Sequence, residues 1–183
     1  MKKHLIAMLS ALSLGACSLS APANHYAAET PTLTLQSFFA GKTTAHGLVK
    51  DWRGNVTRRF HATIEGDFDK EGRGTLDEVF TWADGEIQTR TWQVWPTGPN
   101  TFEGTAGDVV GKATGQAYGN ALHWKYVLAV KTPSGSTINL TMDDRMYLLN
   151  DGTLMNMTGM YKFGLKVGEV VIFIQQAPNQ KAK

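Results

Sequence analysis

From Thr43 to Gln175, apolar side chains tend to recur at every second position, and the period of an amphipathic helix is missing. Turn sequences such as Asp84-Gly85, Gly119-Asn120 and Asn150-Asp151-Gly152 separate the alternating runs, and their residues tolerate positive φ. The pattern therefore predicts about nine or ten β-strands joined by hairpins. The runs cover residues 43–52, 56–68, 75–82, 86–95, 101–106, 112–118, 121–130, 137–148, 153–163 and 167–175.

Consecutive hairpins without a crossover helix favour an antiparallel sheet that closes on itself, because closure leaves no unpaired edge. We therefore expect an all-β fold in which one meander forms a lipocalin-like or fatty-acid-binding-protein-like barrel. A short helical or irregular segment, residues 35–39, comes before the first strand. Its Phe38-Phe39 pair is expected to plug or cap the barrel.

Alternation also predicts which side chains point into the barrel. Three inward faces carry one charged residue each, and these residues are Arg58, Glu78 and Asp144. The run 86–95 alternates poorly, so either its Arg90 face or the opposite face is the inner one. With Arg90 inside, the barrel would hold two arginines and two carboxylates.

The N-terminus has the pattern of a secretory signal, with Lys2 and Lys3 followed by an apolar run, residues 5–14, that is too short to span a bilayer. Leu14-Gly15-Ala16-Cys17 then resembles the lipobox of bacterial lipoproteins, in which the cysteine is acylated and becomes the mature N-terminus. The alternative is an ordinary signal, cut at a small-residue site such as Ala21 or Ala23.

These features predict a signal peptide at 1–16, an acylated Cys17 and flexible tether at 17–32, a barrel at 33–177 and a disordered tail at 178–183. Ser18-Leu19 after the cysteine, with no Asp, favours an outer-membrane lipoprotein on the periplasmic side in a Gram-negative host. The single cysteine excludes an intramolecular disulfide.

Charge excludes one class of partner. The chain has 18 Lys and Arg against 16 Asp and Glu, and removal of Lys2 and Lys3 leaves 16 against 16. A mature domain without net charge is not expected to bind nucleic acid. The predicted partners are the membrane, through the N-terminal acyl chains, and a lipid or other apolar small molecule.

Several strings in one order resemble a bacterial lipoprotein family of unknown function, domain of unknown function 3833. They are Val56-Thr57-Arg58-Arg59-Phe60, Gln88-Thr89-Arg90-Thr91-Trp92, Asp108-Val109-Val110-Gly111, Gly119-Asn120-Ala121-Leu122, Asp143-Asp144-Arg145-Met146-Tyr147-Leu148-Leu149 and Lys162-Phe163-Gly164-Leu165-Lys166-Val167-Gly168-Glu169-Val170. The family pattern has Asp-Asp-Trp where this chain has Asp143-Asp144-Arg145. The resemblance implies no catalytic residues, and its association with fatty-acid modification points toward lipids.

Charges inside a barrel are costly unless they are paired, so the inward charges need an explanation. In one interpretation, Arg58 and Arg90 hold the carboxylate or phosphate of an amphipathic ligand, since a planar guanidinium binds such groups bidentately. The wall around the ligand would consist of Phe60, Trp92, Trp124 and Tyr126. In the other interpretation, the arginines pair internally with Glu78 or Asp144 and satisfy a polar core.

No cofactor or metal is expected. His46, His61 and His123 lie on three separate strands without ligand spacing, and the chain has no nucleophile elbow, phosphate loop or dinucleotide motif. The sequence thus favours a binding protein over an enzyme. Two alternatives stay open: an enzyme or accessory in membrane-lipid modification, and an envelope scaffold with a fully packed barrel.

Overall fold

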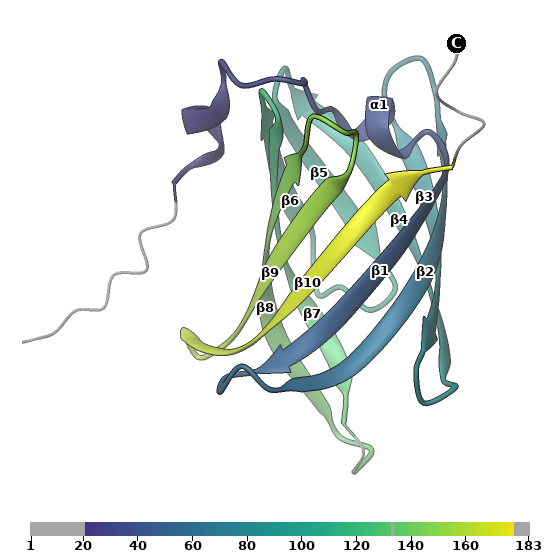
Figure 1. The fold of residues 1–183 in the computed structure, drawn as a ribbon, viewed down its shortest axis with the longest axis vertical. Helices are drawn as coiled ribbons and strands as arrows, with labels where there is room; N and C mark the ends of the chain where they lie inside the picture. Colours follow the sequence, from purple (N-terminus) through teal and green to yellow (C-terminus); the bar gives the residue numbers. More distant parts are fainter. Residues whose placement is uncertain (1–20, 133, 178–183) are drawn as a thin grey trace, which may run out of the picture.

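The computed structural model describes residues 21–132 and 134–177, and these form a closed antiparallel barrel of ten strands (Figure 1). Each strand pairs with its neighbours in sequence, and β1 pairs with β10 to close the wall. The predicted all-β barrel and all ten strand runs are confirmed, with ends shifted by at most three residues. The strands are β1 (Gly41–Asp51), β2 (Val56–Phe68), β3 (Gly74–Trp82), β4 (Ile87–Gly98), β5 (Thr101–Ala106), β6 (Ala113–Tyr118), β7 (Ala121–Lys131), β8 (Thr137–Leu148), β9 (Leu154–Lys162) and β10 (Leu165–Gln176).

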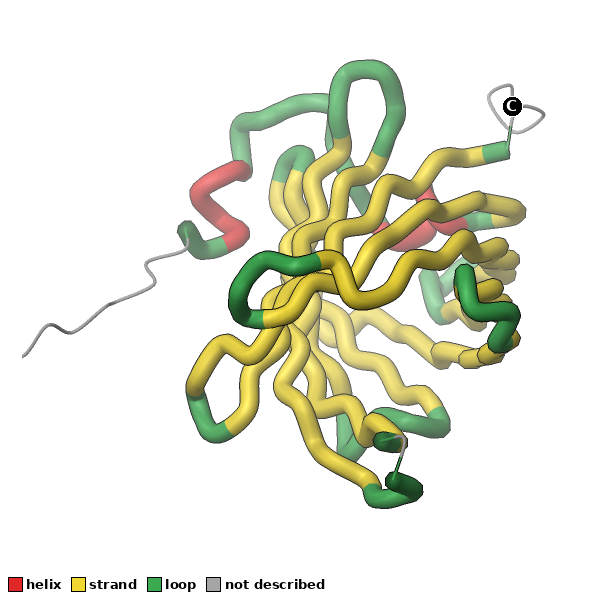
Figure 2. Tube along the Cα trace, turned by 60° about the horizontal axis from the view of Figure 1, so that its bottom comes forward, coloured by secondary structure: helices red, strands yellow, loops and turns green. Residues whose placement is uncertain are grey.

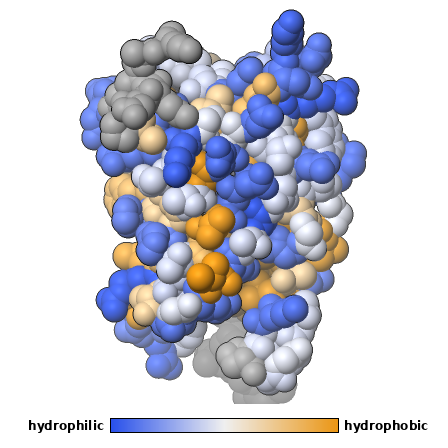
Figure 3. All heavy atoms as spheres, turned by 90° about the vertical axis from the view of Figure 1, so that its right-hand side faces the viewer, coloured by the Kyte–Doolittle hydropathy of each residue, from blue (hydrophilic) through white to orange (hydrophobic). Residues whose placement is uncertain are grey.

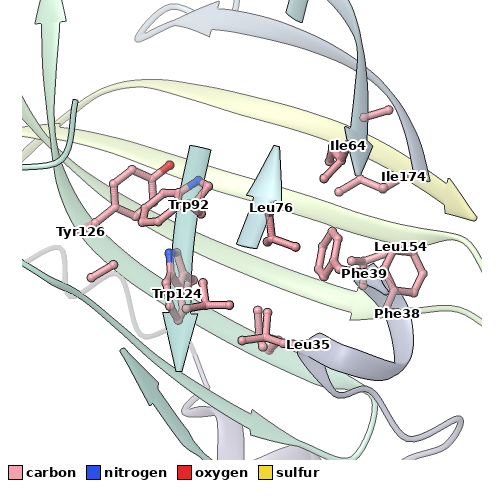
Figure 4. Close-up of a cluster of buried hydrophobic side chains, with 14 of the residues drawn as sticks. Leu35, Phe38, Phe39, Ile64, Leu76, Trp92, Trp124, Tyr126, Leu154 and Ile174 are labelled. Atoms are coloured by element: carbon pink, nitrogen blue, oxygen red, sulfur yellow. The ribbon is translucent and has the colours of Figure 1, made fainter. Parts of the chain in front are cut away.

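One end of the barrel is sealed by the short helix α1 (Leu35–Phe39), and we call it the closed end (Figure 1). The side chains of Thr34 and Ser37 cap the first turn reciprocally. Phe38 and Phe39 are 3% and 5% exposed and point into the barrel core, so the predicted plug is confirmed (Figure 4). Gln176 of β10 donates hydrogen bonds to the carbonyls of Ser37 and Phe38 and so fixes the helix to the wall.

Glycines on the inner wall make room for aromatic rings. A Cβ on Gly115 would lie 2.2 Å from the ring of Trp124, and one on Gly104 would lie 2.9 Å from it. The indole therefore lies flat on β5 and β6. A Cβ on Gly66 would lie 1.9 Å from the carbonyl oxygen of Phe39, so this glycine allows α1 to sit deep in the closed end.

The wall is incomplete next to β5 and β6, because these two strands are short. Pairing of β4 with β5 begins only at Trp92, and within the described chain Ile87–Thr91 has no backbone partner on that side. The loop that follows β5 instead runs along β7, with Val110 N donating to Val127 O and Ala129 N donating to Asp108 O. Among the described residues, side chains rather than backbone hydrogen bonds connect this loop to Ile87–Thr91 of β4.

The described part of the predicted tether, from Ala21 onward, packs on the barrel. A single 3₁₀ turn, η1 (Ala23–Tyr26), lies near the closed end (Figure 1), and Ala23 is 1% exposed. Arg145 donates a hydrogen bond to the carbonyl of Ala21, and the hydroxyl of Tyr26 lies 3.5 Å from that of Tyr147. The composition of this segment predicts a flexible tether, because composition contains no information about contacts with distant residues such as Arg145 and Tyr147.

Residues 1–20 and 178–183, which include Cys17 and the predicted signal and tail, lie outside the described residues. None of the helices in the described part of the chain is long and apolar enough to cross a bilayer.

Candidate functional site

Arg90 lies at the centre of a buried ionic cluster. Its Nε is 3.0 Å from both carboxylate oxygens of Asp108, and its Nη2 is 2.8 Å from Oδ2 of the same residue. Its Nη1 is 3.5 Å from Oε2 of Glu78, which faces Arg90 directly across β3 and β4. The Arg90 face of β4 is therefore the inner one, and Arg90 is paired internally rather than free to hold a ligand carboxylate.

The Arg90–Asp108 pair also joins the two parts of the incomplete wall. Asp108 belongs to the loop along β7, whereas Arg90 belongs to the stretch of β4 that has no strand partner. The two side chains are only 12% and 28% exposed. This ion pair therefore replaces backbone pairing at this point of the barrel.

Asp144 adds a second carboxyl group to the interior. It faces Trp124 of β7 and Thr158 of β9 across the sheet, and it is 5% exposed. Within the part of the chain that the structure describes, Oδ1 of Asp144 and Oδ1 of Asn156 have no hydrogen-bond partner, and Oε2 of Glu78 has only the ion pair with Arg90 at 3.5 Å. The interior thus offers polar atoms that the protein itself leaves unsatisfied.

Burial shifts the protonation of these groups. Desolvation raises the pKa of Glu78 to about 7, although Arg90 opposes this shift. Desolvation likewise raises the pKa of Asp144 to about 7, against the hydrogen bond from Thr158 and the charge of Arg90. One arginine faces three carboxyl groups here, so near neutral pH the cluster retains protons and presents both hydrogen-bond donors and acceptors.

The four predicted wall residues form two separate aromatic groups. Trp92 packs edge-on against Trp124 and Tyr126, with ring centroids 5.7 Å and 5.2 Å away (Figure 4). All three are buried, and burial raises the pKa of Tyr126 well above its ordinary value. Phe60 lies apart from them, nearer the other end of the barrel.

At that other end, Phe60 contacts Phe80 and Trp82 of β3, with ring centroids 5.4 Å and 5.0 Å away. Inner-face side chains there are half-buried, among them Phe80, Trp82, Leu128, Val130 and Met160. Solvent therefore reaches the inner face from this side, and we call it the open end. Figure 2 brings it forward, with the hairpin turns arranged around it.

Arg58 is on the predicted face but not in the interior. Its side chain is 34% exposed at the open end, 2.7 Å from Asp84 and 2.8 Å from Glu86, and its Cζ lies 3.8 Å from the ring centroid of Trp82. The prediction that it is buried was wrong, because alternation gives the face of a strand but not the depth, and Arg58 is the third residue of β2. It borders a depression of about 260 Å³ together with Val56 and Asp84.

Sequence reasoning missed three polar members of the site. Asn156 and Thr158 belong to a buried alternating face of β9, and the same test that found Glu78 would have found them. Alternation could not have identified Asp108, because this residue lies in a loop. Its contact with Arg90 forms only when the folded chain brings the loop beside β4.

The histidines do not join the site. His46 and His61 face each other on β1 and β2, with ring centroids 6.4 Å apart. Nη1 of Arg145 donates a hydrogen bond to Nδ1 of His123 at 2.8 Å, and desolvation together with the charge of Arg145 lowers the pKa of His123 to about 4. Across residues 21–132 and 134–177, no three His, Cys, Asp or Glu side chains form a group that would hold a metal ion.

The closed meander and its inward-facing side chains define a lipocalin-like barrel. A solved structure with this fold is an S-type phycobiliprotein lyase, CPES, from Guillardia theta, with a TM-score of 0.56 and 7% identity. The match covers 82% of this chain and 95% of that one, and at this identity it shows the fold alone. The chain belongs to the family described as protein of unknown function, domain of unknown function 3833, whose profile matches residues 11–176. No curated protein matches the sequence.

Proposed function

We propose that the barrel binds a small amphipathic molecule, such as a lipid, which enters through the open end. The observation that carries this proposal is the buried carboxyl group of Asp144, whose Oδ1 has no partner among the described residues. An unsatisfied buried polar atom costs stability, and a ligand that bonds to it recovers that cost. The half-buried aromatic side chains of Phe80 and Trp82 provide the apolar route to it.

The charges of the cluster define the polar group of the ligand. Arg90 is already held by Asp108 and Glu78, and Arg58 by Asp84 and Glu86, so the arginines are not the head-group contacts that the sequence suggested. Carboxyl groups outnumber the cation in the interior. The ligand therefore presents a hydrogen-bond donor, such as a hydroxyl, amide N–H or ammonium group, to Asp144 and Glu78. The barrel fold that the chain shares with a phycobiliprotein lyase supports a function beyond that of a packed scaffold.

Native mass spectrometry of residues 21–183, purified from a bacterial envelope, tests this proposal. Bound compounds are extracted and identified, and binding is titrated with fatty acids, fatty alcohols, monoacylglycerols and phospholipids. We expect a one-to-one complex with a donor-bearing amphiphile. Asp144→Asn is expected to weaken it at least about tenfold, since a hydrogen bond to a charged group contributes roughly 1.5–3 kcal/mol.

Asp143→Asn is the matched control, because Asp143 points to the opposite face and pairs with Arg145 at 2.8 Å. It is expected to leave the affinity unchanged. An apo mass for the unaltered protein at saturating concentrations of every compound would overturn the proposal and favour a packed scaffold.

We further propose that the mature protein is a lipoprotein anchored through acyl chains on Cys17, on the periplasmic side of an outer membrane. The order Leu14-Gly15-Ala16-Cys17 supports it. The packed segment supports it too: cleavage of an ordinary signal at Ala21 or Ala23 would remove residues whose carbonyl or side chain contacts the barrel.

The intact mass of the membrane-extracted protein decides between the two cleavage sites. A chain that begins at Cys17 and carries three acyl groups, lost on Cys17→Ala, is the expected result. An unmodified chain that begins near Ala21 would contradict the anchor.

A further inference from the structure

Exposed apolar side chains gather at the open end. All five hairpin connections there carry at least one large apolar residue that is exposed at or next to the turn. We call this group the apolar crown; it consists of Trp52, Val56, Ile87, Val110, Ile138, Phe163 and Leu165. Phe163 is 92% exposed, Leu165 73%, Trp52 69% and Ile87 68%.

The closed end has the opposite character. Its β2–β3 turn reads Asp69-Lys70-Glu71-Gly72-Arg73, and its β4–β5 and β6–β7 turns contain Pro99-Asn100 and Gly119-Asn120. Among the described turns of that end, only Leu149 is a large apolar residue that is strongly exposed. On the side shown in Figure 3, hydrophilic side chains gather at the upper end, and hydrophobic ones lie mainly in the middle, among hydrophilic ones. Single exposed apolar residues are ordinary, but their concentration in the turns of one end indicates a contact surface.

Cations accompany the most exposed members of the crown. Arg53 lies over the ring of Trp52, with its Cζ 4.7 Å from the centroid, and Lys162 lies over Phe163, with its Nζ 4.8 Å away. These residues belong to the β1–β2 and β9–β10 hairpins, which are neighbours because β1 pairs with β10 (Figure 1). Aromatic residues next to Lys and Arg are typical of segments that lie at a membrane–water interface.

Acidic groups at this end are engaged within the protein. Arg58 holds Asp84 and Glu86, Arg90 holds Asp108, and Lys50 and Lys166 hold Glu169. The carboxylate of Asp51 accepts hydrogen bonds from its own turn. The crown therefore presents apolar tips with positive charge at two adjacent hairpins.

We propose that the apolar crown docks the open end of the barrel on the surface of an anionic lipid bilayer. A fluid bilayer contacts all the separate turn tips around the opening at once, with the rings in the interfacial layer and Arg53 and Lys162 among the head groups. The proposal goes beyond ligand binding and does not depend on it. Where both hold, docking brings the entrance of the barrel to the source of an amphipathic ligand.

Vesicle binding by residues 21–183 tests the crown, since this part of the chain contains every strand and packed segment that the structure describes. Flotation is measured with phosphatidylglycerol–phosphatidylethanolamine vesicles and with phosphatidylcholine vesicles, at low and high salt. We expect tighter binding to the anionic vesicles, weakened by salt. Quenching of tryptophan fluorescence by brominated lipid, lost on Trp52→Phe, would locate Trp52 in the interface.

The triple variant Trp52→Ser, Phe163→Ser, Leu165→Ser is expected to bind anionic vesicles at least about tenfold more weakly, because burial of each apolar side chain contributes to interfacial binding. The matched control replaces three exposed apolar residues outside the crown, in Val79→Ser, Leu149→Ser, Phe173→Ser. It is expected to bind as the unaltered protein does, and near-ultraviolet circular dichroism confirms that both variants are folded.

Absence of binding to either vesicle type would overturn the proposal and make a protein partner the better occupant of the crown. An equal loss in both triple variants, or undiminished binding by the crown variant, would also overturn it. None of these results would affect ligand binding in solution, which Asp144→Asn tests separately.

Discussion

Replacement of Asp144 by Asn should remove a large part of the pH dependence of the barrel's stability. Burial raises the pKa of Asp144 from its ordinary value of 3.8 to about 7 in the folded protein. The folded state therefore binds more protons than the unfolded state between about pH 4 and 7, and the free energy of unfolding falls as the pH rises through this window. The stabilisation is complete below the ordinary pKa and is lost above the folded one.

The magnitude follows from the size of the shift. About three pKa units, at about 1.4 kcal/mol per unit, correspond to roughly 4 kcal/mol of stability lost between pH 4 and 8. Asparagine has nearly the shape of protonated aspartic acid but does not ionise. Asp144→Asn should therefore match the unaltered protein at low pH and exceed its free energy of unfolding by roughly 2–4 kcal/mol at pH 8.

Urea unfolding followed by tryptophan fluorescence between pH 5 and 8 measures the difference, and Trp124 next to Asp144 is among the reporters. Asp143→Asn is the control, because this neighbour faces outward and should leave the trend with pH in place. Parallel stability curves for Asp144→Asn and the unaltered protein would refute the reasoning, since they would mean that Asp144 does not change its charge across this range.

Three further substitutions test the supports of the site. Arg90→Ala leaves buried carboxylates without their cation and should lower the free energy of unfolding by about 3–5 kcal/mol, or Tm by roughly 10 °C. Replacement of the more exposed Arg58 by Ala should lower it by about 1 kcal/mol or less, and equal losses would contradict the difference in depth between the two arginines. Gly66→Ala should lower the free energy of unfolding by roughly 2–3 kcal/mol, because its Cβ would meet the α1 backbone, whereas Gly107→Ala has open space and should change it by less than about 0.5 kcal/mol. Arg145→Ala should increase hydrogen exchange in the N-terminal segment but not in the strands, and uniform exchange would show that the arginine supports the whole barrel.

The barrel was predictable because its signal is local. Alternation and turn residues are each contained in a few neighbouring positions, so the ten strands and the inward positions of Glu78 and Asp144 could be inferred one hairpin at a time. The Phe38-Phe39 plug was predictable for a related reason: two large apolar residues next to a barrel must be buried somewhere.

The sequence alone did not show how far from the ends of the barrel a residue lies, or which residues from distant parts of the chain contact one another. Arg58 and Arg90 both lie on inner faces, yet one is at the rim and the other in the core, since a strand pattern does not show where the barrel ends. The partner of Arg90 was missed because Asp108 reaches it from a loop that replaces a missing length of wall. The apolar crown emerges only when turns far apart in the sequence are brought to one end.

The proposed anchor and the proposed crown constrain each other. Cys17 lies four residues before Ala21, whose carbonyl Arg145 holds near the closed end (Figure 1), and four residues span at most about 14 Å. The crown lies at the other end of strands such as β10, whose 12 residues extend over roughly 40 Å. An acylated Cys17 therefore places the anchoring membrane beside η1, with the crown directed away from it.

A protein anchored through Cys17 as proposed should consequently link two membranes rather than lie flat on one. Reconstituted through its acyl chains into one vesicle population, it is expected to cluster with a second, anionic population that carries no protein, as measured by light scattering and by energy transfer between the two. The variant Trp52→Ser, Phe163→Ser, Leu165→Ser should insert equally well but fail to cluster the vesicles. If that variant clusters them as efficiently as a protein with the unaltered crown, the crown is not the second contact.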